Sequence, residues 1–187
     1  MTHWLAPVLT SGPTFHLADD LSPSRSGAGY DRSMVEEGNA APSFSLPSDA
    51  GERISLESLR GKHVVLYFYP KDDTPGCTVQ ACAIRDAWDA FERSGAVVLG
   101  VSPDDEESHM KFREKYELPF TLLADEDHAV SEAYGVWVEK TYAGNTYMGV
   151  ERSTFVIGPD GTLEKIMRPV KPDTHADDVL AALPRAA

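Results

Sequence analysis

Residues 67–78 read Tyr67-Phe-Tyr-Pro-Lys-Asp-Asp-Thr-Pro-Gly-Cys-Thr78, and they join a short apolar run to a helical pattern. Within this stretch, Thr74 followed by Pro75 is typical of a helix N-cap with proline at the first helical position, which places Cys77 in the first turn. A thiol there faces unpaired backbone N–H groups and the positive end of the helix dipole, and both favour the thiolate. The stretch therefore predicts a strand-to-helix junction that presents a nucleophilic cysteine.

The second cysteine, Cys82, lies on the same predicted helix. Read alone, it is as consistent with a small buried thiol as with a redox partner, because its neighbours Val79 and Ala83 are apolar. A C-x4-C pair is also half of a zinc site, but the sequence has no second pair and no H-x3-5-H spacing. We therefore expect no metal and no other cofactor. We expect all six histidines on the surface or in the N-terminal segment: His3, His16, His63, His109, His128 and His175.

Apolar runs and helical patterns alternate along the rest of the chain. The runs are short and rich in Val, Leu, Phe or Tyr, as buried strands are, and they occupy residues 63–69, 96–102, 120–124, 153–157 and 162–167. Helical patterns occupy residues 78–93, 106–116, 127–134 and 174–183. The first pattern places Val79, Cys82 and Phe91 on its apolar side, and the second does so for Met110 and Phe112.

Two turn sequences complete the predicted topology. Pro159-Asp160-Gly161 predicts an antiparallel hairpin between the last two apolar runs, and Asp49-Ala50-Gly51 predicts another between residues 43–46 and 53–55. Strands that alternate with helices favour parallel pairing, whereas the hairpins favour antiparallel pairing. The sequence therefore predicts an α/β fold with a mixed central sheet flanked by helices and an N-terminal β-hairpin.

Length and charge narrow the function. A chain of 187 residues fits one ordinary domain. Its formal charge of -13 has the wrong sign for nucleic acid or an anionic membrane. The longest apolar run, residues 64–69, is far shorter than the ~20 residues of a membrane-spanning helix. Without a signal sequence or a disulfide framework, the chain is expected in the cytoplasm.

Residues 1–33 differ from the rest in composition. They are rich in Ser, Gly and Pro and show no sustained period, which predicts a flexible N-terminal extension that is disordered or not native. Met34 opens the first stretch of globular composition, so one hypothesis is that the native chain begins there. The alternative is a genuine disordered extension. In either case, residues 34–187 form the predicted domain.

Pro70, Thr74 and Cys77 match the P-x3-T-x2-C motif of the peroxiredoxins. With Cys82 five residues further on, the stretch resembles the Q-type, or bacterioferritin-comigratory, subfamily of atypical two-cysteine enzymes. The resemblance covers nearly all of residues 36–183, and its similar segments are 38–46, 59–62, 100–104, 123–125, 134–137 and 152–157. It implies a thioredoxin-like fold, reduction of hydrogen peroxide and organic hydroperoxides, and recycling by thioredoxin or a similar dithiol reductant.

The resemblance also implies roles for single residues. Cys77 would be the peroxidatic cysteine, and Cys82 would resolve its sulfenic acid as an intramolecular disulfide. Thr74 would position the peroxide, Pro70 would shield the sulfur from water, and Arg152 would stabilise the thiolate. Displacement at the peroxide oxygen builds negative charge on the leaving oxygen, so a fixed guanidinium, a hydroxyl and backbone N–H groups would all lower the barrier.

Three further residues bear on this interpretation. Gln80 is a departure from the family pattern, because many relatives carry Glu there, and it leaves no carboxylate one turn from the sulfur. Trp137 and Tyr142 either line the pocket or belong to an aromatic core. For assembly, we expect a monomer or a weak dimer.

Helix geometry sets a condition on any Cys77–Cys82 bond. Residues five apart on a helix differ by about 7.5 Å of rise and about 140° of rotation, which separates their Cα atoms by roughly 8 to 9 Å. A disulfide needs about 4.4 to 6.8 Å. The first turns of the helix are therefore expected to unwind when the bond forms.

Two other functions fit the same cysteines. A dithiol-disulfide exchange protein would share the fold, but its cysteines usually read C-x-x-C, which this sequence lacks. A non-enzymatic redox sensor or holdase would use the same oxidation to change partners. It would differ from a peroxidase by showing little turnover with a reducing system.

Overall fold

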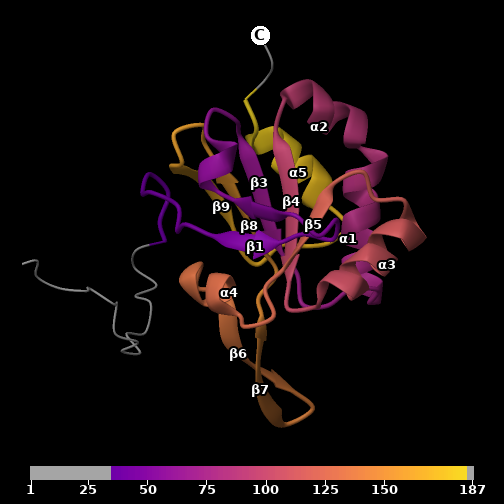
Figure 1. The fold of residues 1–187 in the computed structure, drawn as a ribbon. Coiled ribbons are helices and arrows are strands. Elements are labelled where there is room, and N and C mark those ends of the chain that lie inside the picture. The colour runs from indigo at the N-terminus through magenta and orange to yellow at the C-terminus, as the bar shows by residue number, and fades with distance from the viewer. Residues whose placement is uncertain (1–34, 185–187) are drawn as a thin grey trace, which may run out of the picture.

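The computed structural model describes residues 35–184 (Figure 1), so the predicted extension at residues 1–33 and the candidate start at Met34 lie outside the described residues. The elements in chain order are β1 (Ser45–Pro47), β2 (Arg53–Ser55), the short 3-10 helix η2 (Glu57–Leu59), β3 (Val64–Phe68), α1 (Pro75–Asp86), α2 (Trp88–Ser94), β4 (Val97–Ser102), α3 (Glu106–Tyr116), β5 (Thr121–Ala124), α4 (Ala129–Ala133), β6 (Trp137–Tyr142), β7 (Asn145–Val150), β8 (Ser153–Ile157), β9 (Leu163–Met167) and α5 (His175–Ala182).

The central sheet has five strands in the order β5-β4-β3-β8-β9. β3 pairs in parallel with β4, and β4 with β5, because helices connect these strands. β3 pairs antiparallel with β8, and β8 with β9 across the predicted turn. β1 and β2 form the predicted N-terminal hairpin. The mixed sheet and both hairpins are thus confirmed, and the fold is a thioredoxin-like α/β fold.

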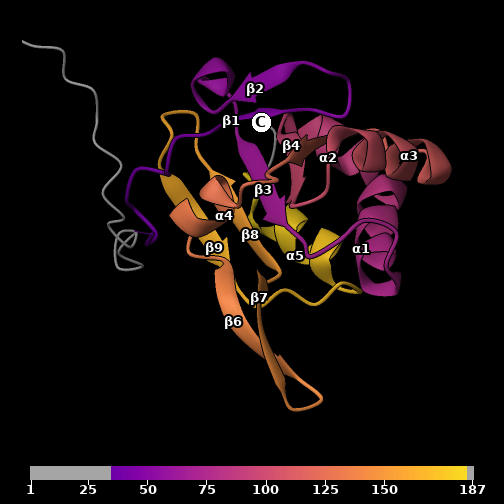
Figure 2. The same ribbon diagram turned by 60° about the horizontal axis from the view of Figure 1, so that its bottom comes forward.

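The core lies on both faces of the sheet, as the side chains of β3 illustrate. Val64, Leu66 and Phe68 pack on the face that the β1–β2 hairpin and α4 cover. Val65 and Tyr67 pack on the other face against apolar side chains of α1, α2, α3 and α5. Figure 2 shows α4 and the group of α1, α2 and α3 on opposite sides of β3. Because successive strand residues alternate between faces, one uninterrupted apolar run supplies both cores.

The prediction for residues 78–93 is wrong in two respects. The segment forms two helices, with a break at Ala87. The predicted apolar side is wrong at Val79, which is 50% exposed, whereas Phe91 is fully buried as predicted. The buried side chains of α1 are instead Cys77, Gln80, Ala81 and Ile84. Hydropathy assigns a glutamine to the surface, but Gln80 is buried because hydrogen bonds satisfy its amide.

The other predicted helices are confirmed with small shifts of their ends. α3 has the predicted bounds, although Met110 is 41% exposed and only Phe112 of the two predicted apolar residues is buried. α4 and α5 fall inside the predicted ranges, with Thr174 as the N-cap of α5. None of the helices in the described part of the chain combines the length and apolarity that a bilayer crossing requires.

The β6–β7 hairpin is an element that the sequence did not predict. Its turn residues, Ala143 and Gly144, both have positive φ (50° and 83°). Most of its side chains are exposed, so no alternation of apolar and polar residues marks its strands. The hairpin projects from the body of the protein (Figure 2), and β7 ends two residues before Arg152.

Candidate active site

The loop after β3 delivers Cys77 to the start of α1. Thr74 is the N-cap, with extended backbone (φ -91°, ψ 151°), and Pro75 is the first helical residue, as predicted. Cys77 is therefore in the first turn, and it is 2% exposed. The Thr74 hydroxyl donates to the carbonyl oxygen of Lys71 (3.0 Å) and does not cap the first-turn N–H groups. Those groups are left to interact with a negative charge at this end of the helix.

Arg152 meets the sulfur from the short link between β7 and β8. Its Nη2 donates to Cys77 Sγ at 3.3 Å, and its Nη1 donates to Gln80 Oε1. Arg152 Nη2 also packs against Gly76, where a Cβ would lie 3.4 Å from it, an ordinary van der Waals distance. The guanidinium therefore lies directly against the first turn of α1, beside the Cys77 sulfur.

A buried polar network continues from Gln80. Its Nε2 lies 3.0 Å from His175 Nδ1, and His175 Nε2 lies 2.7 Å from Thr154 Oγ1. All three residues are fully buried, and they come from α1, α5 and β8. The prediction that the histidines lie on the surface is therefore wrong for His175. It is also wrong for His109, which is likewise fully buried.

The burial of both histidines could have been predicted from helical periodicity in the sequence. Residues three or four apart share a helix face. His175 lies four residues before the buried Val179, and His109 lies three residues before the buried Phe112. Helical periodicity thus pointed to burial, although it could not name the polar partners.

Burial dominates the electrostatics around the sulfur. Burial and, second, the positive charge of Arg152 together lower the pKa of His175 to about 4, so the ring is neutral at pH 7. Burial, with repulsion from Arg152 second, also lowers the pKa of Lys140. Lys140 donates to the carbonyl oxygen of Val150 (2.6 Å). Burial raises the pKa of Tyr67 well above its usual range, and the charge of Cys77 adds to that rise. The site is therefore largely desolvated.

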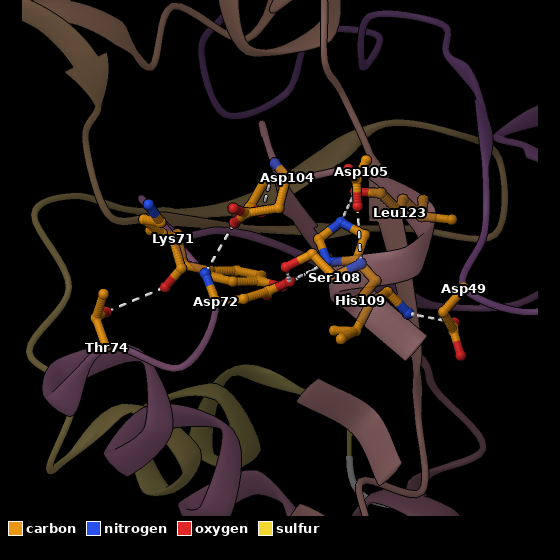
Figure 3. A network of polar contacts seen from close by, with 12 residues as sticks. Asp49, Lys71, Asp72, Thr74, Asp104, Asp105, Ser108, His109 and Leu123 are labelled. Carbon is orange, nitrogen blue, oxygen red and sulfur yellow. Dashed lines mark hydrogen bonds and ion pairs between the residues drawn. The ribbon is translucent and has the colours of Figure 1, made fainter. Parts of the chain in front are cut away.

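A second polar network holds the loop before α1, and Asp72 is its centre (Figure 3). The Asp72 carboxylate accepts from Tyr69, Ser108 and His109, and its backbone N–H donates to Asp104; these distances lie between 2.7 and 2.8 Å. His109 is fixed from its other side, because its Nε2 lies 3.1 Å from the carbonyl oxygen of Leu123.

The end of α3 contacts the chain on both flanks of the first turns of α1. Asp73, which has a positive φ of 52°, accepts from Lys115 (2.6 Å) and Tyr116 (2.5 Å). Arg85, late in α1, donates to the carbonyl oxygen of Tyr116 (2.8 Å). These partners are 31 to 43 residues apart in the sequence, so no local pattern could have predicted them.

The other predicted residues occupy different environments. Cys82 is partly buried, and it shares the continuous helix α1 with Cys77; both thiols are free. Pro70 is exposed at the end of β3. Trp137 belongs to the core, where it stacks on His128 (ring centroids 3.9 Å apart) and packs on the sheet face opposite Cys77. Tyr142 is 76% exposed and does not belong to the core.

A buried cysteine in the first turn of a helix, held beside a guanidinium on a thioredoxin-like fold, defines a thiol peroxidase. Residues 38–166 match the AhpC/TSA family. The peroxiredoxin Bcp of Bacillus subtilis (strain 168) is 49% identical over 149 residues, which are 80% of this chain and 95% of that protein. The peroxiredoxin Bcp of Escherichia coli (strain K12) is 48% identical over 146 residues, which are 78% of this chain and 94% of that protein.

Solved structures of peroxiredoxins are also similar to this chain. Peroxiredoxin Q from Xanthomonas campestris has a TM-score of 0.71 and 40% identity, and the match covers 74% of this chain and 88% of that one. Peroxidoxin BcpB from Mycobacterium tuberculosis has a TM-score of 0.70 and 34% identity, and the match covers 79% of this chain and 96% of that one. The chain therefore belongs to the Bcp, or peroxiredoxin Q, subfamily of the AhpC/TSA family.

Proposed function

We propose that residues 34–187 reduce hydrogen peroxide and organic hydroperoxides through a sulfenic acid on Cys77. Cys82 resolves this acid as an intramolecular disulfide, and thioredoxin or a similar dithiol reductant recycles the enzyme. The observation that supports this proposal most directly is the 3.3 Å contact of Arg152 Nη2 with the buried Cys77 Sγ. Support for organic substrates comes from the alkyl peroxide reduction activity of the Xanthomonas campestris bacterioferritin comigratory protein, which is 40% identical to this chain.

In the first step, the Cys77 thiolate attacks one peroxide oxygen and the O–O bond breaks. The sulfur keeps that oxygen as a sulfenic acid, and the other oxygen leaves with the bonding pair and takes a proton to become water or an alcohol. Charge grows on the leaving oxygen, so Arg152 and the first-turn N–H groups stabilise the transition state. The Thr74 hydroxyl turns from Lys71 to the peroxide, and the Pro70 ring limits access of water.

Resolution follows when the Cys82 thiol attacks the sulfenic sulfur, which forms the disulfide and releases water. Both cysteines lie on α1, so the helix must first open. Gly76 weakens its start, and Pro75 contributes no backbone donor there. The contacts of Asp73 and Arg85 with the end of α3 flank the opening segment and confine it to the first turns.

Amide hydrogen exchange tests this opening. We expect the disulfide form to exchange residues 78–85 at least about tenfold faster than the reduced form, because the disulfide holds α1 locally unfolded. Helix α3, which contains no cysteine, serves as the internal control and should keep its protection. Equal protection of residues 78–85 in the two redox states would refute both the unwinding step and resolution by Cys82 within the chain.

Rapid mixing of the reduced protein with peroxide, with and without thioredoxin, tests the proposed function itself. We expect fast single-turnover consumption without thioredoxin and sustained turnover with it. In the Arg152→Lys variant the single-turnover rate should fall about tenfold or more, because lysine keeps the charge but loses the planar pair of donors, and an oxyanion donor is worth ~2 to 4 kcal/mol.

The matched control is Arg60→Lys, which alters an arginine paired with Glu57. Its rate should equal that of the unaltered protein. If Arg152→Lys were as fast as this control, Arg152 would have no part in the chemistry. If the protein consumed one equivalent of peroxide but never turned over with a dithiol reductant, it would be a redox sensor rather than a peroxidase.

A further inference from the structure

The hydrogen bonds that run inward from Arg152 have a fixed direction. A guanidinium only donates, so the Gln80 atom that meets Arg152 is the amide oxygen, an acceptor. The other end of the same amide, Nε2, then donates to His175 Nδ1. A ring nitrogen that accepts carries no hydrogen, so the hydrogen of the neutral ring lies on Nε2 and is donated to Thr154 Oγ1.

We propose that neutral His175, with its hydrogen on Nε2, is a positioning residue that keeps the Gln80 amide oxygen on Arg152 and thereby keeps the guanidinium on Cys77. This inference rests on the role proposed above for Arg152. His175 does not touch the reacting atoms; it acts through Gln80. Thr154 completes the arrangement, since an acceptor at its position favours the hydrogen on His175 Nε2.

Gln80 needs a hydrogen-bond acceptor on its nitrogen side, because rotation of its side-chain amide by 180° exchanges the oxygen and the NH₂ group. In the reversed orientation its N–H group would face the N–H groups of Arg152, and two donors repel each other. Gln80, His175 and Thr154 are all fully buried, so water cannot repair a mismatched pair. The acceptor on His175 Nδ1 therefore decides between the two orientations, and only one of them holds Arg152.

The surroundings of His175 keep it in the required neutral form. Arg152 opposes a positive charge on the ring, whereas Asp178 on α5 favours one. From β3, the uncharged ring of Tyr67 packs on it with centroids 5.6 Å apart. Burial is the largest influence, and with Arg152 it holds the pKa at about 4. The ring therefore takes up a second hydrogen, which would oppose the Gln80 N–H, only when the pH falls toward 4.

A double-mutant cycle separates positioning from a merely structural role. We expect His175→Phe to slow single-turnover peroxide consumption about tenfold, a fraction of the loss that follows removal of an oxyanion donor. In the Gln80→Glu background the same replacement should change the rate by less than about twofold. The reason is that a carboxylate presents an oxygen to Arg152 whichever way it turns, so it needs no histidine to orient it.

The control is Ser153→Ala, on the same strand as Thr154 and next to Arg152 in the chain. Its hydroxyl is buried without a hydrogen-bond partner among the described residues, so its loss should leave the rate unchanged. An equal loss for His175→Phe in both backgrounds would mean that the histidine only supports the fold. A rate within about twofold of the unaltered protein would overturn the positioning role outright.

Nitrogen-15 NMR of labelled histidine gives a readout that needs no activity. At pH 7 the unaltered protein should show the hydrogen of His175 on Nε2 and titrate only near pH 4. In Gln80→Glu the midpoint should move to higher pH, because the new carboxylate favours the positively charged ring. A hydrogen on Nδ1 in the unaltered protein, or an unmoved midpoint in the variant, would overturn the inference.

Arg152→Lys, measured in parallel, separates the role of His175 from the role of Arg152. If that variant is slow while His175→Phe is not, the role of Arg152 stands and only the inference about His175 fails. If Arg152→Lys is as fast as the unaltered protein, the role proposed for Arg152 fails, and the inference fails with it.

Discussion

Replacement of Cys77 by serine is expected to abolish peroxide reduction, with a fall of at least about a hundredfold in the single-turnover rate. In the proposed function, Arg152 and the first-turn N–H groups of α1 stabilise negative charge on the Cys77 sulfur. A serine hydroxyl in the same place stays protonated at pH 7, and among the described residues the side-chain partner of Cys77 is the guanidinium of Arg152, which is not a base. Rapid mixing with hydrogen peroxide or an organic hydroperoxide measures the loss.

The result has to be separated from a loss of folding. Serine is close to cysteine in size, so the Cys77→Ser protein should keep its secondary structure, which circular dichroism would verify. The Cys82→Ser protein is the matched control, because it changes the other thiol of the same helix and should still consume one equivalent of peroxide. Retention of more than a few per cent of the rate in Cys77→Ser would show that another group attacks the peroxide.

The Cys82→Ser protein should keep the first oxidation and lose sustained turnover with thioredoxin. Peroxide reaches Cys77 as before, because Cys82 lies one turn further along α1, away from the contact with Arg152. Without a second thiol the sulfenic acid persists, and further peroxide converts it to the sulfinic acid. We expect single-turnover consumption at the normal rate, thioredoxin-coupled turnover reduced at least about tenfold, and a mass increase from over-oxidation.

Val79→Ser is the control for placing a serine on this part of α1. Val79 is 50% exposed on the same helix, so this variant adds a hydroxyl without removing a thiol, and it should cycle normally. Undiminished turnover of Cys82→Ser with thioredoxin would show that the reductant attacks the Cys77 sulfenic acid directly. The helix would then have no need to unwind during catalysis.

The network around His175 gives one reason why the closed helix is preferred in the reduced state. Fully or partly buried hydrogen bonds link α1 to α5 and β8, and they join Gln80, Arg152, His175 and Thr154. Opening the first turns of α1 breaks the Gln80 links and exposes their partners. In the proposed cycle the disulfide therefore forms against a cost that the reduced protein does not bear, which agrees with the exchange pattern expected above.

Much of the fold was readable because its signals are local. Apolar runs in the sequence predicted the buried strands, and β8 was predicted with the bounds that the structure has. Helix α3 likewise has its predicted ends, because Asp105 caps it and Glu117 ends it in a left-handed conformation. The β6–β7 hairpin was missed for the converse reason. Its strands are largely exposed, so they carry no apolar alternation for a sequence to display.

The sequence by itself determined the place of Cys77 in the fold. Thr74, Pro75 and Cys77 are neighbours, and the strand before them is a local apolar run. Their arrangement as N-cap, first helical residue and first-turn cysteine depends on backbone geometry over a few residues. For that reason the junction of strand and helix could be predicted before any tertiary contact was known.

Only the tertiary structure decided what surrounds that thiol. Arg152 meets Gln80 across 72 residues of sequence, and His175 meets it across 95. Hydropathy places such polar side chains at the surface, because water is their default partner. Gln80 and His175 are fully buried and Arg152 is partly buried because the fold brings each donor to an acceptor. That match is a property of distant segments packed together rather than of any stretch of the chain.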